Sequence, residues 1–150
     1  MNCKYCNREI IVEAPYCPWC GKRIRPLCPK ESLLLAKHLG RSSDADFTRA
    51  RAIYLVYQNG LYFPQYANIE EYGVKELRLG RAMTQNYKVI GRDFVDDYGN
   101  LLFIGGKNWT IGQVNELKSL SLRQVNRMIA DGIINDEMQC NEIRAAIKDA

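Results

Sequence analysis

The chain contains no long hydrophobic run and only one histidine, His38, among its 150 residues. Its longest apolar stretches, 52–57 and 101–106, fall far short of the roughly 20 residues that a membrane-spanning helix needs. No secretory signal opens the sequence, so we expect a cytoplasmic protein with no membrane partner. A single histidine leaves no convincing Ser–His–Asp set, and we therefore expect a protein that is not an enzyme.

The composition is that of a globular protein, because 47% of the residues are hydrophobic and 25% are charged. A length of 150 residues suits one ordinary domain, or one small domain and a tiny one. The net charge of +4 is unevenly placed. Residues 1–30 hold six basic side chains against Glu9 and Glu13, whereas the remainder holds 15 basic and 15 acidic side chains. Such a basic head is compatible with an anionic partner.

Six cysteines are present, and four of them follow the pattern Cys-x2-Cys, ten residues, Cys-x2-Cys. In a cytoplasmic protein, paired cysteines favour a metal over disulfides. Each two-residue gap allows a tight turn that aims two sulfurs at one point, and Gly21 can adopt the positive φ that such a turn requires. We therefore expect one structural Zn²⁺ ion, with these ligands: Cys3, Cys6, Cys17 and Cys20.

Residues 1–27 are too few to bury a sufficient core, so the metal must supply folding energy. Residues 9–16 contain alternating and β-branched side chains, which indicate a short hairpin. Four thiolates leave no coordination position open for water, which favours a structural ion over a catalytic one. The segment resembles the short zinc ribbons found at the start of many bacterial and phage proteins. We interpret Cys28 as a bystander in a linker and Cys140 as a packing residue.

The remainder of the chain, residues 28–150, shows helical periodicity and turn signals. The sequence therefore predicts a small zinc ribbon followed by an all-α domain that contains a helix-turn-helix. Ser42, Ser43 and Asp44 offer an N-cap for the second helix, and Asn68 offers one for the third. The predicted helices are 31–39, 45–59, 69–78, 82–97, 110–118, 122–130 and 141–148.

Residues 69–97 are the first helix-turn-helix candidate, because a short turn that holds Gly80 joins two predicted helices. We expect Leu77 and Leu79 to fill the angle between them. The buried stripe of the second helix is predicted to contain Met83, Tyr87, Ile90 and Phe94. Its exposed side chains can contact phosphates and base edges, and they are Arg81, Thr84, Gln85, Asn86, Lys88 and Arg92. The alternative is a core helix with a solvated polar face.

Residues 44–150 resemble a helical module of phages, plasmids and conjugative elements of Gram-positive bacteria. The likeness rests on IEEYG at 69–73 with LGRAMTQNYKV at 79–89, on WTIGQVNELKSL at 109–120 and on INDEMQCNEIR at 134–144. The resemblance implies that the first stretch is a DNA-binding helix-turn-helix. It places Arg81, Thr84, Gln85, Asn86 and Lys88 on the recognition helix. Gln139 departs from the module, which usually has a Ser or Thr cap there.

Residues 110–134 are a second candidate, which superficially resembles the winged helix-turn-helix of excisionases. Its reading helix would be 121–127, and we give it less weight than the first candidate. The alternative is a helical pair that packs on the first unit. The side chains that suit nucleic-acid contact here are Arg123, Gln124, Asn126 and Arg127.

The predicted function is sequence-specific binding of double-stranded DNA, as a regulator of a phage or mobile element. RNA as the target and a homodimer as the assembly stay open. The alternative is a protein-interaction module that grips a host protein, as small phage inhibitors and anti-CRISPR proteins do. The aromatic loop at 62–66 would suit that role, although its rings can equally fill the core.

Overall fold

The computed structural model describes residues 2–10, 15–38, 43–106 and 108–150. Helices dominate these residues, and between them only isolated antiparallel bridges pair backbone segments within the described ranges. None of the helices in these ranges is both long enough and apolar enough to cross a bilayer. The helices are α1 (Pro29–His38), α2 (Ser43–Gln58), α3 (Ile69–Lys75), α4 (Arg81–Asp93), α5 (Ile111–Glu116), α6 (Leu122–Ala130) and α7 (Cys140–Asp149).

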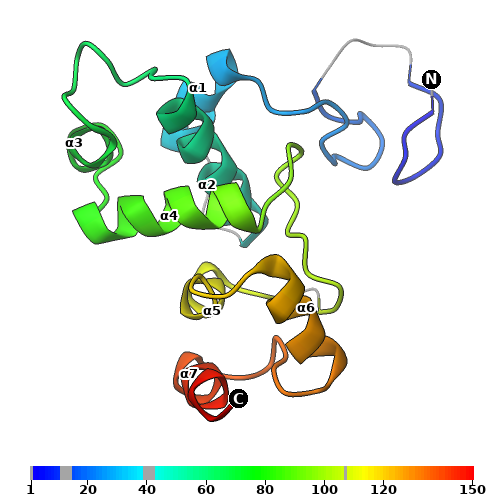
Figure 1. Ribbon diagram of the computed structural model, residues 1–150. Coiled ribbons are helices and arrows are strands. Elements are labelled where there is room, and N and C mark those ends of the chain that lie inside the picture. The colour runs from blue at the N-terminus through cyan, green and yellow to red at the C-terminus, as the bar shows by residue number, and fades with distance from the viewer. Residues whose placement is uncertain (1, 11–14, 39–42, 107) are drawn as a thin grey trace.

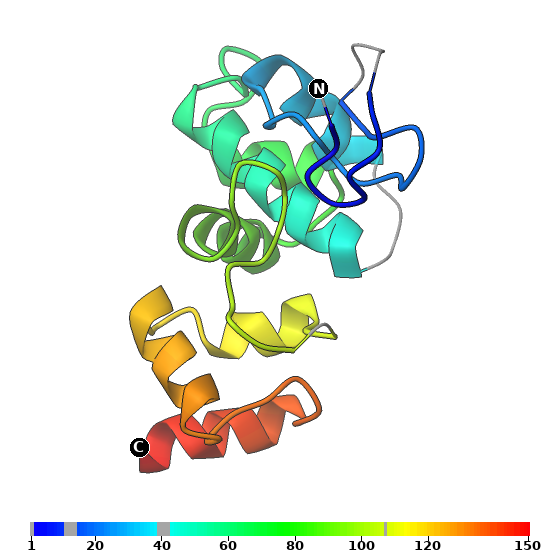
Figure 2. The same ribbon diagram turned by 90° about the vertical axis from the view of Figure 1, so that its right-hand side faces the viewer.

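The molecule has three parts, which Figures 1 and 2 show from two sides. Helices α1 to α4 form the upper part, in which α2 packs against both α1 and α4. Helices α5 to α7 form a lower lobe beneath α4. The cysteine-rich head, residues 2–27, lies beside the upper part, next to the loop that leaves α4.

The core of the upper part forms where α2 crosses α4. Phe47, Ala50 and Ile53 of α2 are buried there. On the facing helix Gly91 is buried, and a Cβ atom there would lie only 2.0 Å from the carbonyl oxygen of Ala50. The absence of a side chain at Gly91 therefore lets the two backbones come into contact.

A chain of three aromatic rings joins the upper part to the lower lobe. The ring centroids of Phe94 and Phe103 lie 5.4 Å apart, and those of Phe103 and Trp109 lie 5.2 Å apart, both edge to face. The indole N–H of Trp109 donates to the carbonyl of Gly105 at 2.8 Å. Gly106 has φ of +81°, and a Cβ there would lie 2.8 Å from the indole nitrogen. The absence of a side chain at Gly106 therefore leaves room for Trp109.

Two helix caps and one buried side-chain amide stabilise the structure of the lower lobe. Thr110 and Ser121 are N-caps that each form a capping box, so α5 and α6 begin at the residues that follow them. The side-chain amide of Gln113 is buried and donates to the carbonyls of Asp136 and Met138 at 2.9 and 2.7 Å. This amide ties α5 to the segment that leads into α7.

The predicted helices are confirmed, with differences at their ends. Helix α6 begins and ends at the predicted residues, whereas α3 ends at Lys75 rather than Arg78. Helix α4 ends at Asp93 rather than Asp97, because Phe94 leaves helical geometry and Val95 pairs with Leu101 in a bridge. The predicted cap at Ser42 lies outside the described residues.

Replacing Gly91 with alanine tests the contact between α2 and α4. The new methyl group would collide with backbone rather than with a flexible side chain, so the helices must separate. We expect Gly91→Ala to lower the unfolding free energy by about 1–3 kcal/mol, measured by chemical denaturation. Gly112→Ala is the control, because its new Cβ would meet its nearest neighbour, the sulfur of Cys140, at an ordinary 3.6 Å. Equal stability of the two variants would contradict the close crossing.

Candidate metal centre and nucleic-acid interface

Two similar turns bring the four predicted cysteine ligands together. In each turn the first cysteine accepts a backbone hydrogen bond from the residue four positions later, from Asn7 to Cys3 at 2.8 Å and from Gly21 to Cys17 at 2.9 Å. Asn7 and Gly21 both have positive φ, 61° and 74°. The positive φ predicted for Gly21 is confirmed. Asn7 was not predicted, although it occupies the same place in the first turn and asparagine tolerates this region.

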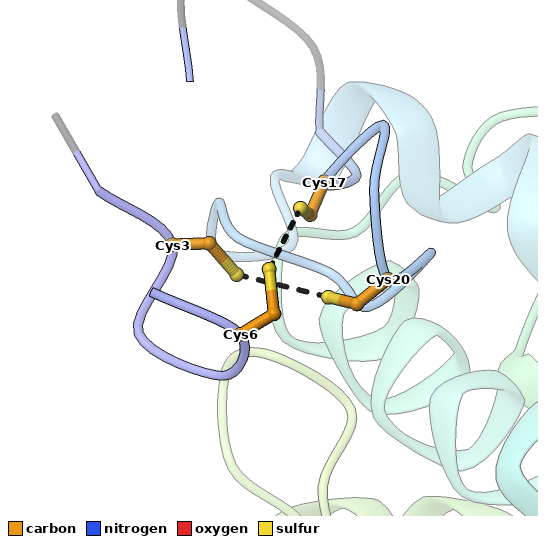
Figure 3. A group of neighbouring side chains, drawn as sticks. All are labelled: Cys3, Cys6, Cys17 and Cys20. Carbon is orange, nitrogen blue, oxygen red and sulfur yellow. Dashed lines mark hydrogen bonds between the residues drawn. The ribbon is translucent and has the colours of Figure 1, made fainter. Parts of the chain in front are cut away.

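The four sulfurs have the spacing of a tetrahedral site (Figure 3). The sulfurs of Cys3 and Cys20 lie 3.7 Å apart, as do those of Cys6 and Cys17, and all four lie within 4.8 Å of one another. A tetrahedral ion with metal–sulfur bonds of about 2.3 Å separates its sulfurs by about 3.8 Å. Disulfide sulfurs would lie at about 2.05 Å. The cysteines are free, and this cluster could hold one metal ion.

The thiols of the cluster influence one another's protonation. Burial raises the pKa of Cys3, but hydrogen bonds from the backbone of Cys6 and Tyr5 and from two thiols outweigh this effect and lower it to about 6. The backbone N–H of Lys22 lowers the pKa of Cys20, but desolvation and the other three thiols raise it to about 11. Sulfur binds a metal as the thiolate, so affinity for an ion is expected to fall as the pH falls.

The cysteine-rich head has almost no apolar core of its own. Cys3, Ile10 and Cys17 form its one cluster of buried apolar side chains among the described residues. Polar contacts attach the head to the loop after α4. The backbone N–H of Leu27 donates to the carbonyl of Asp97 at 2.6 Å, and the amide of Asn100 donates to the hydroxyl of Tyr5 at 2.8 Å. The stability of the head therefore depends on what the four sulfurs bind.

The remaining predictions for the head have mixed outcomes. Cys28 is exposed and lies outside the four-sulfur cluster, and Cys140 is half-buried at the start of α7. Two bridges, between Asn2 and Glu9 and between Tyr16 and Arg23, close the two turns. The middle of the hairpin predicted at 9–16 lies outside the described residues, because residues 11–14 are not described.

The first helix-turn-helix candidate consists of α3, α4 and the turn between them. Asn68 caps α3 as predicted, since its side chain accepts from the N–H of Glu71 at 2.8 Å. Leu77 and Leu79 are half-buried against the core, which confirms their predicted place between the helices. Figure 1 shows α3 end-on and α4 lengthwise, so the two helices cross.

Thr84 is not on the exposed face of α4, which corrects the prediction. Its side chain is completely buried, and its hydroxyl donates to the carbonyl of Gly80 at 3.0 Å. Thr84 faces Gly73 of α3, where a Cβ would lie 2.0 Å from the threonine hydroxyl. Close packing of the two helices therefore encloses this side chain. Met83, predicted to be buried, is 41% exposed.

Several of the other predicted residues of α4 already contact other side chains of the protein. Asn86 accepts from the ammonium of Lys118 at 2.5 Å, and the ammonium of Lys88 lies 4.2 Å from the ring centroid of Tyr57. Arg92 is exposed and forms an ion pair with Asp93 at 2.8 Å. Gln85 is half-buried, and Arg81 is exposed at the start of the helix. Helix α4 contacts α2, α3 and α5, so little of its surface remains for a groove.

The second candidate, α5 and α6, presents a more open surface. Arg123, Gln124 and Arg127 are exposed, whereas Val125 and Met128 on the other side of α6 are buried. Gln124 also accepts from the N–H of Ser121 at 2.8 Å. Helix α6 forms the left-hand edge of the lower lobe in Figure 2. Three of the four residues predicted on α6 are thus exposed, whereas Arg81 and Arg92 are the exposed ones of the six predicted on α4.

Asn126, the fourth residue predicted on α6, has a structural contact. It is half-buried, and its side chain accepts from the N–H of Ile104 at 3.0 Å. No ion pair within the described ranges involves Arg123 or Arg127. The two guanidinium groups, one helical turn apart, are therefore the free cations of this face.

Comparisons with family models, with curated proteins and with solved structures give no match. The likenesses to mobile-element modules, to excisionases and to short zinc ribbons therefore stay predictions.

Removing one sulfur tests the metal centre. We expect the wild-type protein to carry one metal ion per chain and Cys20→Ser to carry none, because three thiolates hold a tetrahedral ion far less firmly. Elemental mass spectrometry of the purified protein measures this ratio. Cys28→Ser is the matched control and should keep its ion. Retention of the ion in Cys20→Ser, or its loss in Cys28→Ser, would contradict the four-sulfur site.

Proposed function

We propose that the cysteine-rich head is a zinc ribbon that holds one structural Zn²⁺ ion. Four thiolates form the ligand set that zinc prefers in closed tetrahedral sites. Two spacings of 3.7 Å between sulfurs support an ion of this coordination. Bound zinc would supply the folding energy that the small core of the head lacks, and a closed site supports a non-enzymatic role.

We further propose that the protein binds double-stranded DNA through a helix-turn-helix formed by α5 and α6. The observation that supports this best is the exposure of Arg123 and Arg127 on one face of α6, with Val125 and Met128 buried behind them. A recognition helix needs such a face, free of the protein's own segments and supported by a core. The short connection 117–121 and the cap at Ser121 fix the direction in which the helix projects.

The two arginines can contact either bases or phosphates of the duplex. A guanidinium can contact two acceptors on guanine in the major groove, or it can pair with a phosphate. Gln124 can contact adenine, although its oxygen also caps the helix. Phosphate contacts fix the position of a protein on the duplex, whereas base contacts select the sequence. A regulator of a mobile element is the role that this proposal, together with the resemblance in residues 44–150, favours.

Helix α4 is the weaker candidate for this role. Thr84 is buried, and Asn86 and Lys88 already have partners inside the protein. Arg81 is the predicted cation of α4 that is both exposed and outside the ion pairs of the described residues. Binding through α4 would require Lys88 and Asn86 to exchange these contacts for contacts with DNA.

A second function, capture of a host protein, has one supporting observation. A cleft of about 220 Å³ lies between α1 and the aromatic loop, and Leu34 of its lining is 63% exposed. Phe63 of the same loop does not line the cleft and is 71% exposed. At the wall of the cleft, the hydroxyl of Tyr72 is buried and has no hydrogen-bond partner among the described residues. Burial raises the pKa of Tyr72 to about 12, so this hydroxyl stays a donor at neutral pH.

A salt series on duplex DNA tests which helix binds. We expect Arg123→Ala and Arg127→Ala each to lower the slope of log affinity against log salt by about 1, because each removes one charge contact. Arg81→Ala and Lys88→Ala should leave the slope unchanged. Fluorescence anisotropy with a labelled duplex gives these slopes.

Lys75→Ala is the control for net charge, because it removes one positive charge from α3 in the upper part of the molecule. A smaller slope in the α4 variants alone would move the proposed interface to α4. No binding of any duplex at low salt would contradict the DNA proposal and favour the protein-interaction alternative.

A further inference from the structure

The cysteine-rich head carries an exposed aromatic and basic surface that the metal centre does not explain. Trp19 lies between the ligands Cys17 and Cys20 and is 59% exposed. Its indole N–H donates to the carbonyl of Glu9 at 3.2 Å, so the ring has a fixed orientation. The guanidinium of Arg8 lies 5.3 Å from its ring centroid. A planar group of a binding partner can stack on an exposed ring of this size that is oriented by a hydrogen bond and lies next to a cation.

Tyr5, on the first turn of the head, has a similar setting. The ammonium groups of Lys4 and Lys22 lie 5.1 and 5.6 Å from its ring centroid. Its hydroxyl accepts from Asn100 of the loop after α4, and 38% of the residue is exposed. The head therefore presents two partly exposed rings, each with a cation within about 6 Å, the range of a cation–π contact.

A cleft of about 800 Å³ begins beside this surface, between the head and the helical body. The turn that carries Trp19 contributes Tyr16 and Lys22 to its wall, and the body contributes Tyr98 and Asn100. The described residues that line the cleft include no acidic one and two basic ones, Lys22 and Arg23, of which Arg23 is buried and paired with Glu31. An anionic chain would therefore enter without meeting a carboxylate in the lining.

We propose that this surface of the head, with the adjoining cleft, binds a single-stranded nucleic acid. A base would stack on Trp19, and Arg8 and Lys22 would attract the phosphates on either side. Single strands expose the faces of their bases, whereas a duplex conceals them, so stacking on a fixed ring selects the single strand. This surface is separate from α6, and the proposal holds whether or not α6 contacts a duplex.

The test is binding of a fluorescein-labelled oligothymidylate to the full-length, metal-loaded protein, measured by anisotropy. We expect Trp19→Ala to weaken binding about tenfold or more, because one stacked base is worth about 1–3 kcal/mol. Trp19→Phe keeps a ring but lacks the indole N–H that orients it, so its binding should fall between that of the wild type and that of Trp19→Ala. Phe63→Ala is the matched control, because Phe63 is 71% exposed and lies on the aromatic loop instead.

Lys22→Ala should lower the slope of log affinity against log salt by about 0.7, the value for one phosphate contact on a single strand. Wild-type protein that fails to bind oligothymidylate at low salt would overturn the proposal. An equal loss in Trp19→Ala and Trp19→Phe would overturn it too, because the indole hydrogen bond would then matter rather than the ring. A duplex of the same length that binds as tightly and depends equally on Trp19 would overturn the choice of a single strand.

The α6 variants separate this proposal from the proposed function. Arg123→Ala and Arg127→Ala should weaken duplex binding and leave oligothymidylate binding unchanged. The metal content of each variant of the head shows whether its fold is intact. Oligothymidylate binding that depends on Trp19 in a protein without duplex binding would support this surface and contradict the role of α6.

Discussion

The edge-to-face contacts of Phe94, Phe103 and Trp109 are the constraint on which the rest of the structure depends. They fix the segment between α4 and α5, and all three parts of the molecule meet at that segment. The cysteine-rich head hydrogen-bonds to Asp97 and Asn100 within it, and the lower lobe begins at its end. Burial of large apolar rings is non-directional, but edge-to-face geometry adds orientation. The relative placement of the three parts therefore follows from these three rings.

The same constraint explains why α4 and α6 differ in exposure. Helix α4 packs against α2, α3 and α5, with the lower lobe beneath it, and its exposed residues are Arg81, Ala82, Met83 and Arg92. Helix α6 lies at the edge of that lobe and buries only the side that carries Val125 and Met128. Both helices have the amphipathic pattern of a recognition helix, so the pattern alone does not separate an edge position from an interior one.

The elements whose signals are local could be predicted from the sequence. The bounds of α6 follow from the cap at Ser121 and the Asp131-Gly132 stop, and the spacing of the cysteines identifies the cluster. Thr84 could not be placed correctly, because its burial depends on Gly73 of another helix. The early end of α4 at Asp93 depends on pairing between Val95 and Leu101, which is also non-local. Trp109 enters the sequence analysis only as part of a family likeness, although it has the largest of the fully buried side chains.

The head and the helical body have separate apolar cores, and this separation has a thermodynamic consequence. An ion that binds only the folded head stabilises it by an amount that grows with the logarithm of the free ion concentration. The body has its own large core and does not share this dependence. The free metal concentration would thus set the fraction of molecules in which the head is folded and holds Trp19 and Tyr5 in place, while the helices remain folded. One polypeptide would then contain a head whose folded fraction rises with the free metal concentration and a helical body whose folded fraction does not depend on it.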